Sequence, residues 1–116
     1  MNKKFKDKNF IISSKEKVSE ALKKINKNEH GILFVTNKKN QLVGVLTDGD
    51  IRRAFLDGET IDSKIEILMN KDFVYAEEST SFESIMKKFD KRYRFIPIVN
   101  QNNELVDFYS LFSDAR

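Results

Sequence analysis

The stretch Leu42–Gly58, LVGVLTDGDIRRAFLDG, decides the fold because it passes from a strand into a helix. The apolar run Leu42–Leu46 predicts a short strand, and Asp50 to Leu56 predicts a helix that Gly58 is well placed to stop. The turn between them holds two aspartates around a glycine and is followed by paired arginines. These residue types suit a metal site, a phosphate site or a well-capped helix, and the stretch alone leaves all three open.

The same pattern recurs later in the chain, which identifies an internal repeat. VTNKKNQLVGVLTDGD (35–50) matches IVNQNNELVDFYSLFS (98–113) at a constant offset of 63 residues. The identical positions are Asn37, Asn40, Leu42 and Val43, which return as Asn100, Asn103, Leu105 and Val106.

An amphipathic helix is predicted upstream of each matching stretch, since apolar residues recur at i, i+3, i+4 and i+7. The two stripes are offset by 64, and the extra residue belongs to the loop after the first helix. Their members are Val18, Ala21, Leu22 and Ile25 in the first half, and Phe82, Ile85, Met86 and Phe89 in the second.

Each half therefore predicts the order β-α-β-β-α, and the fold class is α+β. Serines at Ser13–Ser14 and Ser79–Ser81 are expected at the starts of the first helices. Asparagine-rich turns are expected to join two strands as hairpins. The predicted strands are Phe10–Ile12, Ile32–Val35 and Leu42–Leu46 in the first half, and Phe73–Tyr75, Phe95–Val99 and Leu105–Tyr109 in the second.

The repeat divides the chain into four segments. The expected segments are a basic N-terminal arm (1–9), a first repeat (10–58), a linker with a short helix (59–72) and a second repeat (73–116), whose last helix we expect to be cut off at Arg116. The linker is expected to pack, because Ile61, Ile65 and Leu68 have helical spacing. Neither small sheet can cover both its faces alone, so the repeats are expected to pack together as one domain.

Composition restricts the class of protein. The 116 residues carry a net charge of +3, with 13 Lys+Arg against 7 Asp+Glu in residues 1–58 (+6) and 8 against 11 in residues 59–116 (−3). There is no cysteine, hence no disulfide framework or thiolate metal site. No apolar run is long enough for a membrane span, and the start lacks the apolar region of a secretory signal. We therefore expect a cytoplasmic protein without membrane contact.

The duplicated order and one signature resemble a tandem pair of cystathionine β-synthase (CBS) domains, also called a Bateman module. The signature is a glycine, two apolar residues, a threonine, two further residues and an aspartate, here Gly44 to Asp50. The resemblance implies two β-α-β-β-α units packed about a pseudo-two-fold axis. The longer string TDGDIRR resembles the CBS pairs attached to bacterial sugar-phosphate isomerases and sugar-1-phosphate nucleotidyltransferases.

The resemblance implies a nucleotide site in which Thr47 and Asp50 bind phosphate and ribose. The ligand would be an adenine nucleotide or a nucleotide-sugar, with no cofactor, metal or catalytic residue. A helix N-terminus after Thr47 favours an anion, and a carboxylate suits two ribose hydroxyls. The further candidate residues are Asp48, Gly49, Arg52 and Arg53 around the turn, and Ile12 and Ile32 as walls for a base.

Plainer interpretations stay open for the same residues. Asp50 can simply cap the helix while Asp48 serves the turn, with Arg52 and Arg53 paired to Asp57 or Glu59. A metal at Asp48 and Asp50 is disfavoured, because both arginines would repel a cation. His30, the only histidine, is interpreted as a polar loop residue.

The second half is predicted to hold a degenerate site. Asp107, Ser110 and Ser113 stand where the first half has Gly44, Thr47 and Asp50, so the carboxylate is lost. Arg92 and Arg94 either contribute to ligand binding at that second site or are solvated charges of a loop.

Four functions compete on the sequence alone. The favoured one is a regulatory module that binds a small nucleotide, forms a homodimer and controls an attached or partner enzyme. The dimer would use helical faces that carry Ala21, Leu22, Ile85 and Met86, although these residues suit a core equally well. Nucleic-acid binding is disfavoured because basic and acidic residues alternate along the chain. An enzyme assisted by a metal and a ligand-free dimerisation module complete the set.

Overall fold

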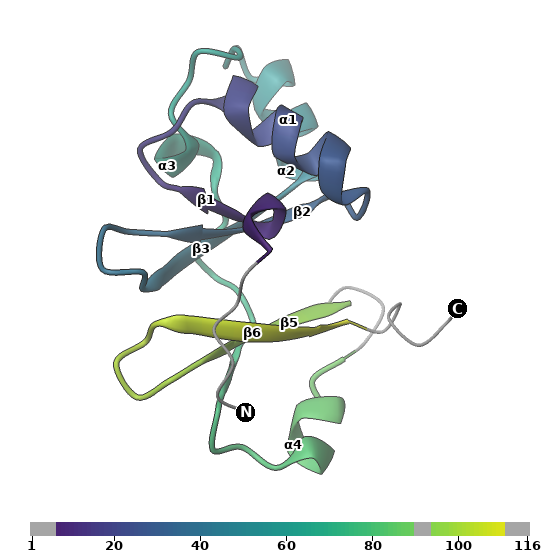
Figure 1. Ribbon diagram of the computed structural model, residues 1–116. Helices are drawn as coiled ribbons and strands as arrows, with labels where there is room; N and C mark the ends of the chain where they lie inside the picture. Colours follow the sequence, from purple (N-terminus) through teal and green to yellow (C-terminus); the bar gives the residue numbers. More distant parts are fainter. Residues whose placement is uncertain (1–6, 90–93, 111–116) are drawn as a thin grey trace. The chain divides into compact units, whose positions relative to one another are not determined.

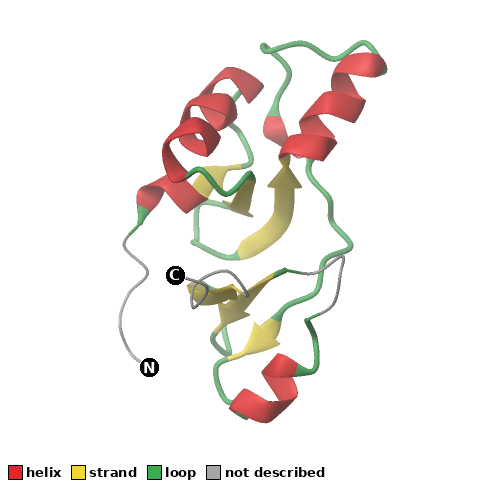
Figure 2. Cartoon of the chain, turned by 90° about the vertical axis from the view of Figure 1, so that its right-hand side faces the viewer, coloured by secondary structure: helices red, strands yellow, loops and turns green. Residues whose placement is uncertain are grey.

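The computed structural model describes residues 7–89 and 94–110, which form two compact units, one before and one after residue 74. Each unit holds a three-stranded sheet, with several helices beside the first sheet and one described helix beside the second (Figures 1 and 2). This confirms the predicted α+β class and the duplicated order. The packing of the two repeats about a two-fold axis stays a prediction.

The first unit is built on strands β1 (Ile11–Ser13), β2 (Ile32–Thr36) and β3 (Leu42–Thr47). β1 runs parallel to β2, and β2 pairs antiparallel with β3. Helices α1 (Val18–Asn28), α2 (Asp48–Leu56) and α3 (Ile65–Leu68) gather on one side of this sheet (Figure 1), and a 3-10 turn, η1 (Lys8–Phe10), precedes β1. Side chains from the sheet and helices share one core: Ile12, Val18, Ala21, Ile25, Leu33, Val35, Leu46, Ile51 and Ile65.

The predicted serine cap of α1 is wrong. The N-cap residue is Lys17, which makes no side-chain cap, while the Ser13 hydroxyl accepts the N–H of Lys15 in a turn. The linker supplies the missing acceptors, since the N–H groups of Val18 and Ser19 donate to the backbone oxygens of Ser63 and Ile61 at 2.9 Å each. Tertiary contacts therefore replace a local cap at this helix start.

The linker 59–72 packs within the first unit. Ile65 is fully buried in its core, as the helical spacing predicted, whereas Ile61 is exposed. Asn70 forms a two-way backbone bridge with Val45, with N···O distances of 2.8 and 3.0 Å, and so lies beside the outer edge of β3. A single-residue pairing thus covers an edge that would otherwise present free backbone groups.

The second unit repeats the plan with β4 (Ala76–Glu77), α4 (Phe82–Met86), β5 (Phe95–Val99) and β6 (Leu105–Ser110). The first strand lies after the predicted Phe73–Tyr75, and α4 ends before Phe89. Ser81 caps α4 by accepting the N–H of Ser84 at 3.2 Å, which confirms a serine there. The predicted last helix lies outside the described residues.

The two hairpins match atom for atom. Asn37 Oδ1 accepts the N–H groups of Lys39 and Gln41, and its Nδ2 donates to Gln41 Oε1, all within 3.0 Å. Asn100 makes the same three bonds to Asn102 and Glu104. A register shift follows Val35 in one hairpin and Ile98 in the other, 63 residues apart. This geometry confirms the repeat.

The helical faces assigned to a dimer are largely core. Ala21 and Ile85 are buried in their own units, and Met86 packs partly against the second core. Leu22 is 36% exposed, and Phe82 is 62% exposed. Of the four residues expected at a dimer face, only Leu22 offers substantial apolar surface on a long helix.

Candidate functional site

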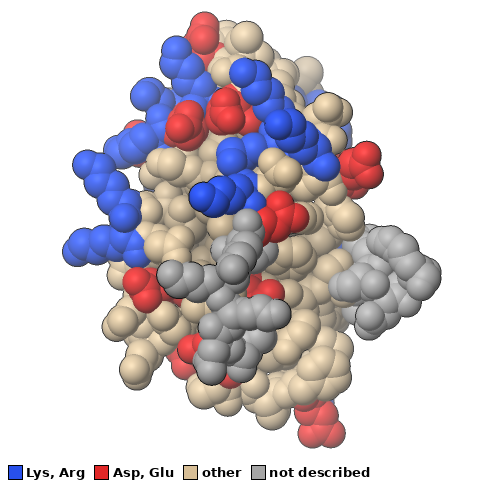
Figure 3. Space-filling view, in the orientation of Figure 1, with Lys and Arg blue, Asp and Glu red and all other residues tan. Residues whose placement is uncertain are grey.

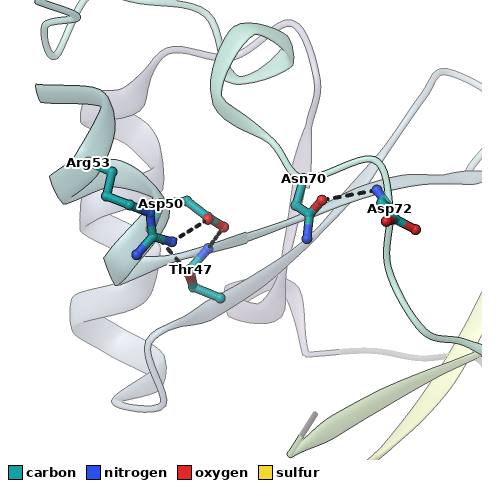
Figure 4. A network of polar contacts seen from close by, with 5 residues as sticks. All are labelled: Thr47, Asp50, Arg53, Asn70 and Asp72. Atoms are coloured by element: carbon teal, nitrogen blue, oxygen red, sulfur yellow. Dashed lines mark hydrogen bonds and ion pairs between the residues drawn. The ribbon is translucent and has the colours of Figure 1, made fainter. Parts of the chain in front are cut away.

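The turn between β3 and α2 is closed by a reciprocal pair of hydrogen bonds (Figure 4). Thr47 is the N-cap residue: its Oγ1 accepts the N–H of Asp50 at 3.2 Å. In return Asp50 Oδ2 accepts the N–H of Thr47 at 2.9 Å. This capping box starts the helix at Asp48, two residues before the predicted start, with Thr47 rather than Asp50 as the cap. The helix ends at Leu56, and Gly58 follows with φ +100°, as the sequence predicted.

The motif is therefore a helix cap as local structure, with Thr47 as the N-cap residue and Asp50 as its partner three residues later. The capping box also fixes the two side chains that the family resemblance assigns to a ligand. The Asp50 side chain keeps 20% of its surface exposed, so its carboxylate is reachable from solvent. A cap and a binding site can thus occupy the same two residues.

Arg53 pairs with Asp50 rather than with Asp57 or Glu59. Its Nη2 donates to Asp50 Oδ1 at 2.9 Å, one turn along the helix. With Oδ2 held by the Thr47 N–H, both carboxylate oxygens of Asp50 have a donor. Arg52 is exposed and makes no ion pair or hydrogen bond within residues 7–89 and 94–110. The structure brings Thr47, Asp50 and Arg53 together and leaves Arg52 outside the group.

The backbone donors of this first turn are partly used. The Asp48 N–H donates to the Gly31 oxygen at 3.0 Å, and the Asp50 N–H goes to Thr47. For the Gly49 N–H, the described part of the chain provides no acceptor. Gly31 has φ +71°, which favours glycine, and the Asp48 carboxylate lies 3.0 Å from the place where a Cβ would stand.

Ile12 and Ile32, the expected walls for a base, lie on different faces of the sheet. Ile12 points into the core against the helices and is 2% exposed. Ile32 stands opposite Thr47 in the register of β2 and β3. Because side chains alternate along a strand, Ile11 rather than Ile12 shares the face of Ile32 and Thr47.

Close packing against Met69 explains why a glycine stands at position 44, the first residue of the signature. A Cβ at this position would stand 2.7 Å from Met69 Sδ and 2.9 Å from its Cγ. The adjoining residue Asn70 accepts the N–H of Asp72 on its Oδ1 at 3.0 Å, as Figure 4 shows. Sequence reasoning missed Met69 and Asn70, since neither carries a motif and the bridge of Asn70 to Val45 in β3 places them here.

The corresponding turn of the second unit is only partly described. Asp107 is partly buried and accepts the N–H of the next residue, Phe108, on its Oδ1. Ser110 ends β6, as Thr47 ends β3. Ser113 and Arg92 lie outside the described residues, and Arg94 is exposed. The degenerate second site stays a prediction.

Charge is unevenly distributed over the described surface. Exposed Lys and Arg lie mostly on the first unit, as Figure 3 shows for one face, and acids stand among them. Lys15 pairs with Glu66 at 3.0 Å, and Lys17 with Asp62 at 3.8 Å. This interleaving divides the positive surface and does not favour a continuous track for a nucleic-acid backbone.

The described residues give no support to a site at the histidine, to a metal site or to a membrane-spanning helix. His30 stands in the loop after α1, with Nδ1 2.8 Å from the Asn28 oxygen. Among the described residues, no three His, Cys, Asp or Glu side chains come together as a metal would require. None of the helices in these same residues has the length and apolar character to cross a bilayer.

The family model of the CBS domain matches residues 1–57 and again residues 64–111. The chain belongs to the CBS-domain family. The two matches correspond to the two repeats, so the chain is a tandem CBS pair. Such pairs are, in general, regulatory ligand-binding modules rather than catalytic ones.

Relatives of known sequence are longer than this chain. A 17.7 kDa protein of Acidianus ambivalens is 28% identical over 108 residues, which are 92% of this chain and 65% of that protein. A protein of Helicobacter pylori strain J99 is 36% identical over 56 residues, 48% of this chain and 17% of its own length. The chain thus spans less than two thirds of either relative.

Solved structures share the fold. Protein MJ1225 of Methanocaldococcus jannaschii superposes with a TM-score of 0.78 at 23% identity, over 95% of this chain and 44% of that one. The cytosolic domain of the Mg²⁺ channel MgtE, in complex with ATP, gives 0.73 at 20% identity, over 86% and 41%. These likenesses establish the CBS fold of this CBS pair.

Proposed function

We propose that this CBS pair is a nucleotide sensor whose ligand is an adenine nucleotide or a nucleotide-sugar, bound in the first repeat. The observation that carries the proposal is the capping box, which presents the Thr47 hydroxyl and the Asp50 carboxylate beside the Gly49 N–H. A carboxylate accepts hydrogen bonds from ribose hydroxyls, and a hydroxyl and an N–H can donate to phosphate oxygens. The ATP complex of MgtE supports the adenine class.

The proposed role is to control an enzyme of sugar-phosphate or nucleotide-sugar metabolism, attached to or associated with the CBS pair. The string TDGDIRR supports this enzyme class through its resemblance to the CBS pairs of such enzymes. A ligand with different affinity for two arrangements of the module would shift the enzyme between two states. A product nucleotide-sugar would then act as a feedback signal.

We also propose that the module works as a homodimer. The exposed apolar side chains of Leu22, Phe55 and Leu56 on α1 and α2 support this assembly. Light scattering of the purified chain should give twice the monomer mass of 13.6 kDa. A monomer mass at high concentration would remove the proposal.

The nucleotide proposal is tested by thermal melting of the chain with AMP, ADP, ATP, CMP and UDP- or CMP-sugars. A ligand at about 100 times its Kd should add roughly 2.7 kcal/mol, a shift of several degrees for a domain of this size. Thr47→Ala and Asp50→Ala should lose the shift and still fold. Asp57→Ala is the matched control, because it removes an exposed carboxylate from the other end of the same helix.

Two outcomes would contradict the proposal. If no nucleotide moves the melting temperature, the module is better explained as a ligand-free dimerisation domain. If Asp50→Ala keeps the shift of the parent chain, a nucleotide binds elsewhere and the site assignment is wrong.

A further inference from the structure

Two neighbouring arginines of the same helix are placed very differently. Arg53 lies across the first turn of α2 with Nη2 on Asp50, whereas Arg52 is exposed and makes no hydrogen bond or ion pair within the described residues. The sequence RR alone gives no reason to separate them. A specific contact therefore distinguishes Arg53.

Gly49 provides the surface on which the Arg53 guanidinium lies. A Cβ built on Gly49 would stand 3.2 Å from Arg53 Nη1 and 3.4 Å from Nη2. The shorter separation is tighter than an ordinary van der Waals contact, so a larger residue would shift the guanidinium by a few tenths of an ångström. The glycine of the TDGD motif therefore allows the Arg53 guanidinium to lie close to the helix backbone.

The Asp50 pair leaves Arg53 with donors to spare. A guanidinium has five N–H donors, and one of them is on Asp50 Oδ1. The Arg53 side chain is 69% exposed, so the others are accessible. The pair also offsets the negative charge of Asp50, which would otherwise repel a phosphate at this turn.

We propose that Arg53, held in place by Asp50 and Gly49, recognises the phosphate of the bound nucleotide and makes the site select nucleotides over nucleosides. The inference rests on the proposed nucleotide site and names the residue that discriminates within it. A guanidinium that one carboxylate already holds loses little conformational entropy when it binds a second anion. Arg52 has no such support and contributes only diffuse charge.

The test measures the Kd of ATP against adenosine, and of CMP against cytidine, by calorimetry on the full chain. Arg53→Met should weaken the nucleotide about tenfold or more, the usual effect of losing a charge-assisted hydrogen bond, while the nucleoside is unchanged. Arg52→Met, one residue away with the same loss of charge, should change neither by more than about twofold.

Gly49→Ala supplies a second test that keeps both arginines. It should shift the Arg53 guanidinium by a few tenths of an ångström and lower the preference for nucleotide over nucleoside in the same direction as Arg53→Met, but by less. Because alanine favours a helix over glycine, the melting temperature of the free chain should stay equal or rise. A loss of binding with a stable fold separates recognition from folding.

The outcomes separate this inference from the proposed function. If the parent chain binds nucleotide and both arginine variants behave alike, the Arg53 assignment is overturned and the sensor stands. If Arg53→Met weakens nucleoside and nucleotide equally, Arg53 does not read the phosphate. If the parent chain binds neither nucleotide nor nucleoside, both proposals are overturned.

Discussion

The two repeats share their hairpin and differ in the strand that leaves it. Asn37 and Asn100 make the same three side-chain bonds 63 residues apart. Seven residues after each asparagine, however, the first repeat has Gly44 and the second has Asp107. Residues that shape the turn are thus kept, while residues beside the candidate site have diverged. The two repeats together separate the residues that the fold requires from those that a site requires.

The largest effect on stability is expected when Gly44 of the first repeat is replaced by aspartate, the residue at the matching position of the second repeat. Gly44→Asp would place a Cβ 2.7 Å from Met69 Sδ and bury a carboxylate, which should cost about 3–5 kcal/mol of unfolding free energy. The reverse change, Asp107→Gly, should cost under about 1 kcal/mol, the usual penalty of glycine in a strand. Urea denaturation of both variants measures the difference.

A double variant identifies the cause of that loss. Adding Met69→Ala to Gly44→Asp should recover the part due to overlap and leave the part due to the buried charge. Equal losses for Gly44→Asp and Asp107→Gly would mean that the two strands are interchangeable and that the repeats have not diverged in packing.

A smaller effect is expected where the repeats agree. Asn37→Ala and Asn100→Ala should each destabilise by about 1–2 kcal/mol, because each removes three hydrogen bonds from a tight turn. The loss should be slightly greater at Asn100, since its Nδ2 donates to the Glu104 carboxylate rather than to an amide. Amide exchange at Gln41 and Glu104 reports each loop separately. A loss confined to one loop would show that the match in geometry is not a match in energy.

Much of this fold could be predicted from local patterns. The asparagine-rich turns and apolar runs placed four strands to within one residue, because hairpins are specified by neighbouring residues. The helix start at Val18 could not be predicted, since its acceptors are backbone oxygens of Ser63 and Ile61 and any residues could supply them. The strand at Ala76–Glu77 is too short to show a period of its own.

The candidate site shows the same division. Thr47 and Asp50 stood out because a capping box has a fixed spacing, and the family signature has the same one. The choice between Arg52 and Arg53 depended on which rotamer reaches Asp50 across Gly49, which sequence spacing does not give. Ile12 and Ile32, predicted as walls of one site, lie on opposite faces of the sheet, because in a strand one residue moves a side chain to the other face.

The docking of the linker has a consequence for how this protein can be divided. The first sequence repeat ends near Gly58. The backbone oxygens that accept the first N–H groups of α1 come later in the chain, and so does the residue that pairs with Val45. The compact unit therefore runs to residue 73, beyond the piece that the repeat defines. Swapping or transplanting a repeat of this kind requires its trailing segment as well, so the unit of exchange is longer than the unit of duplication.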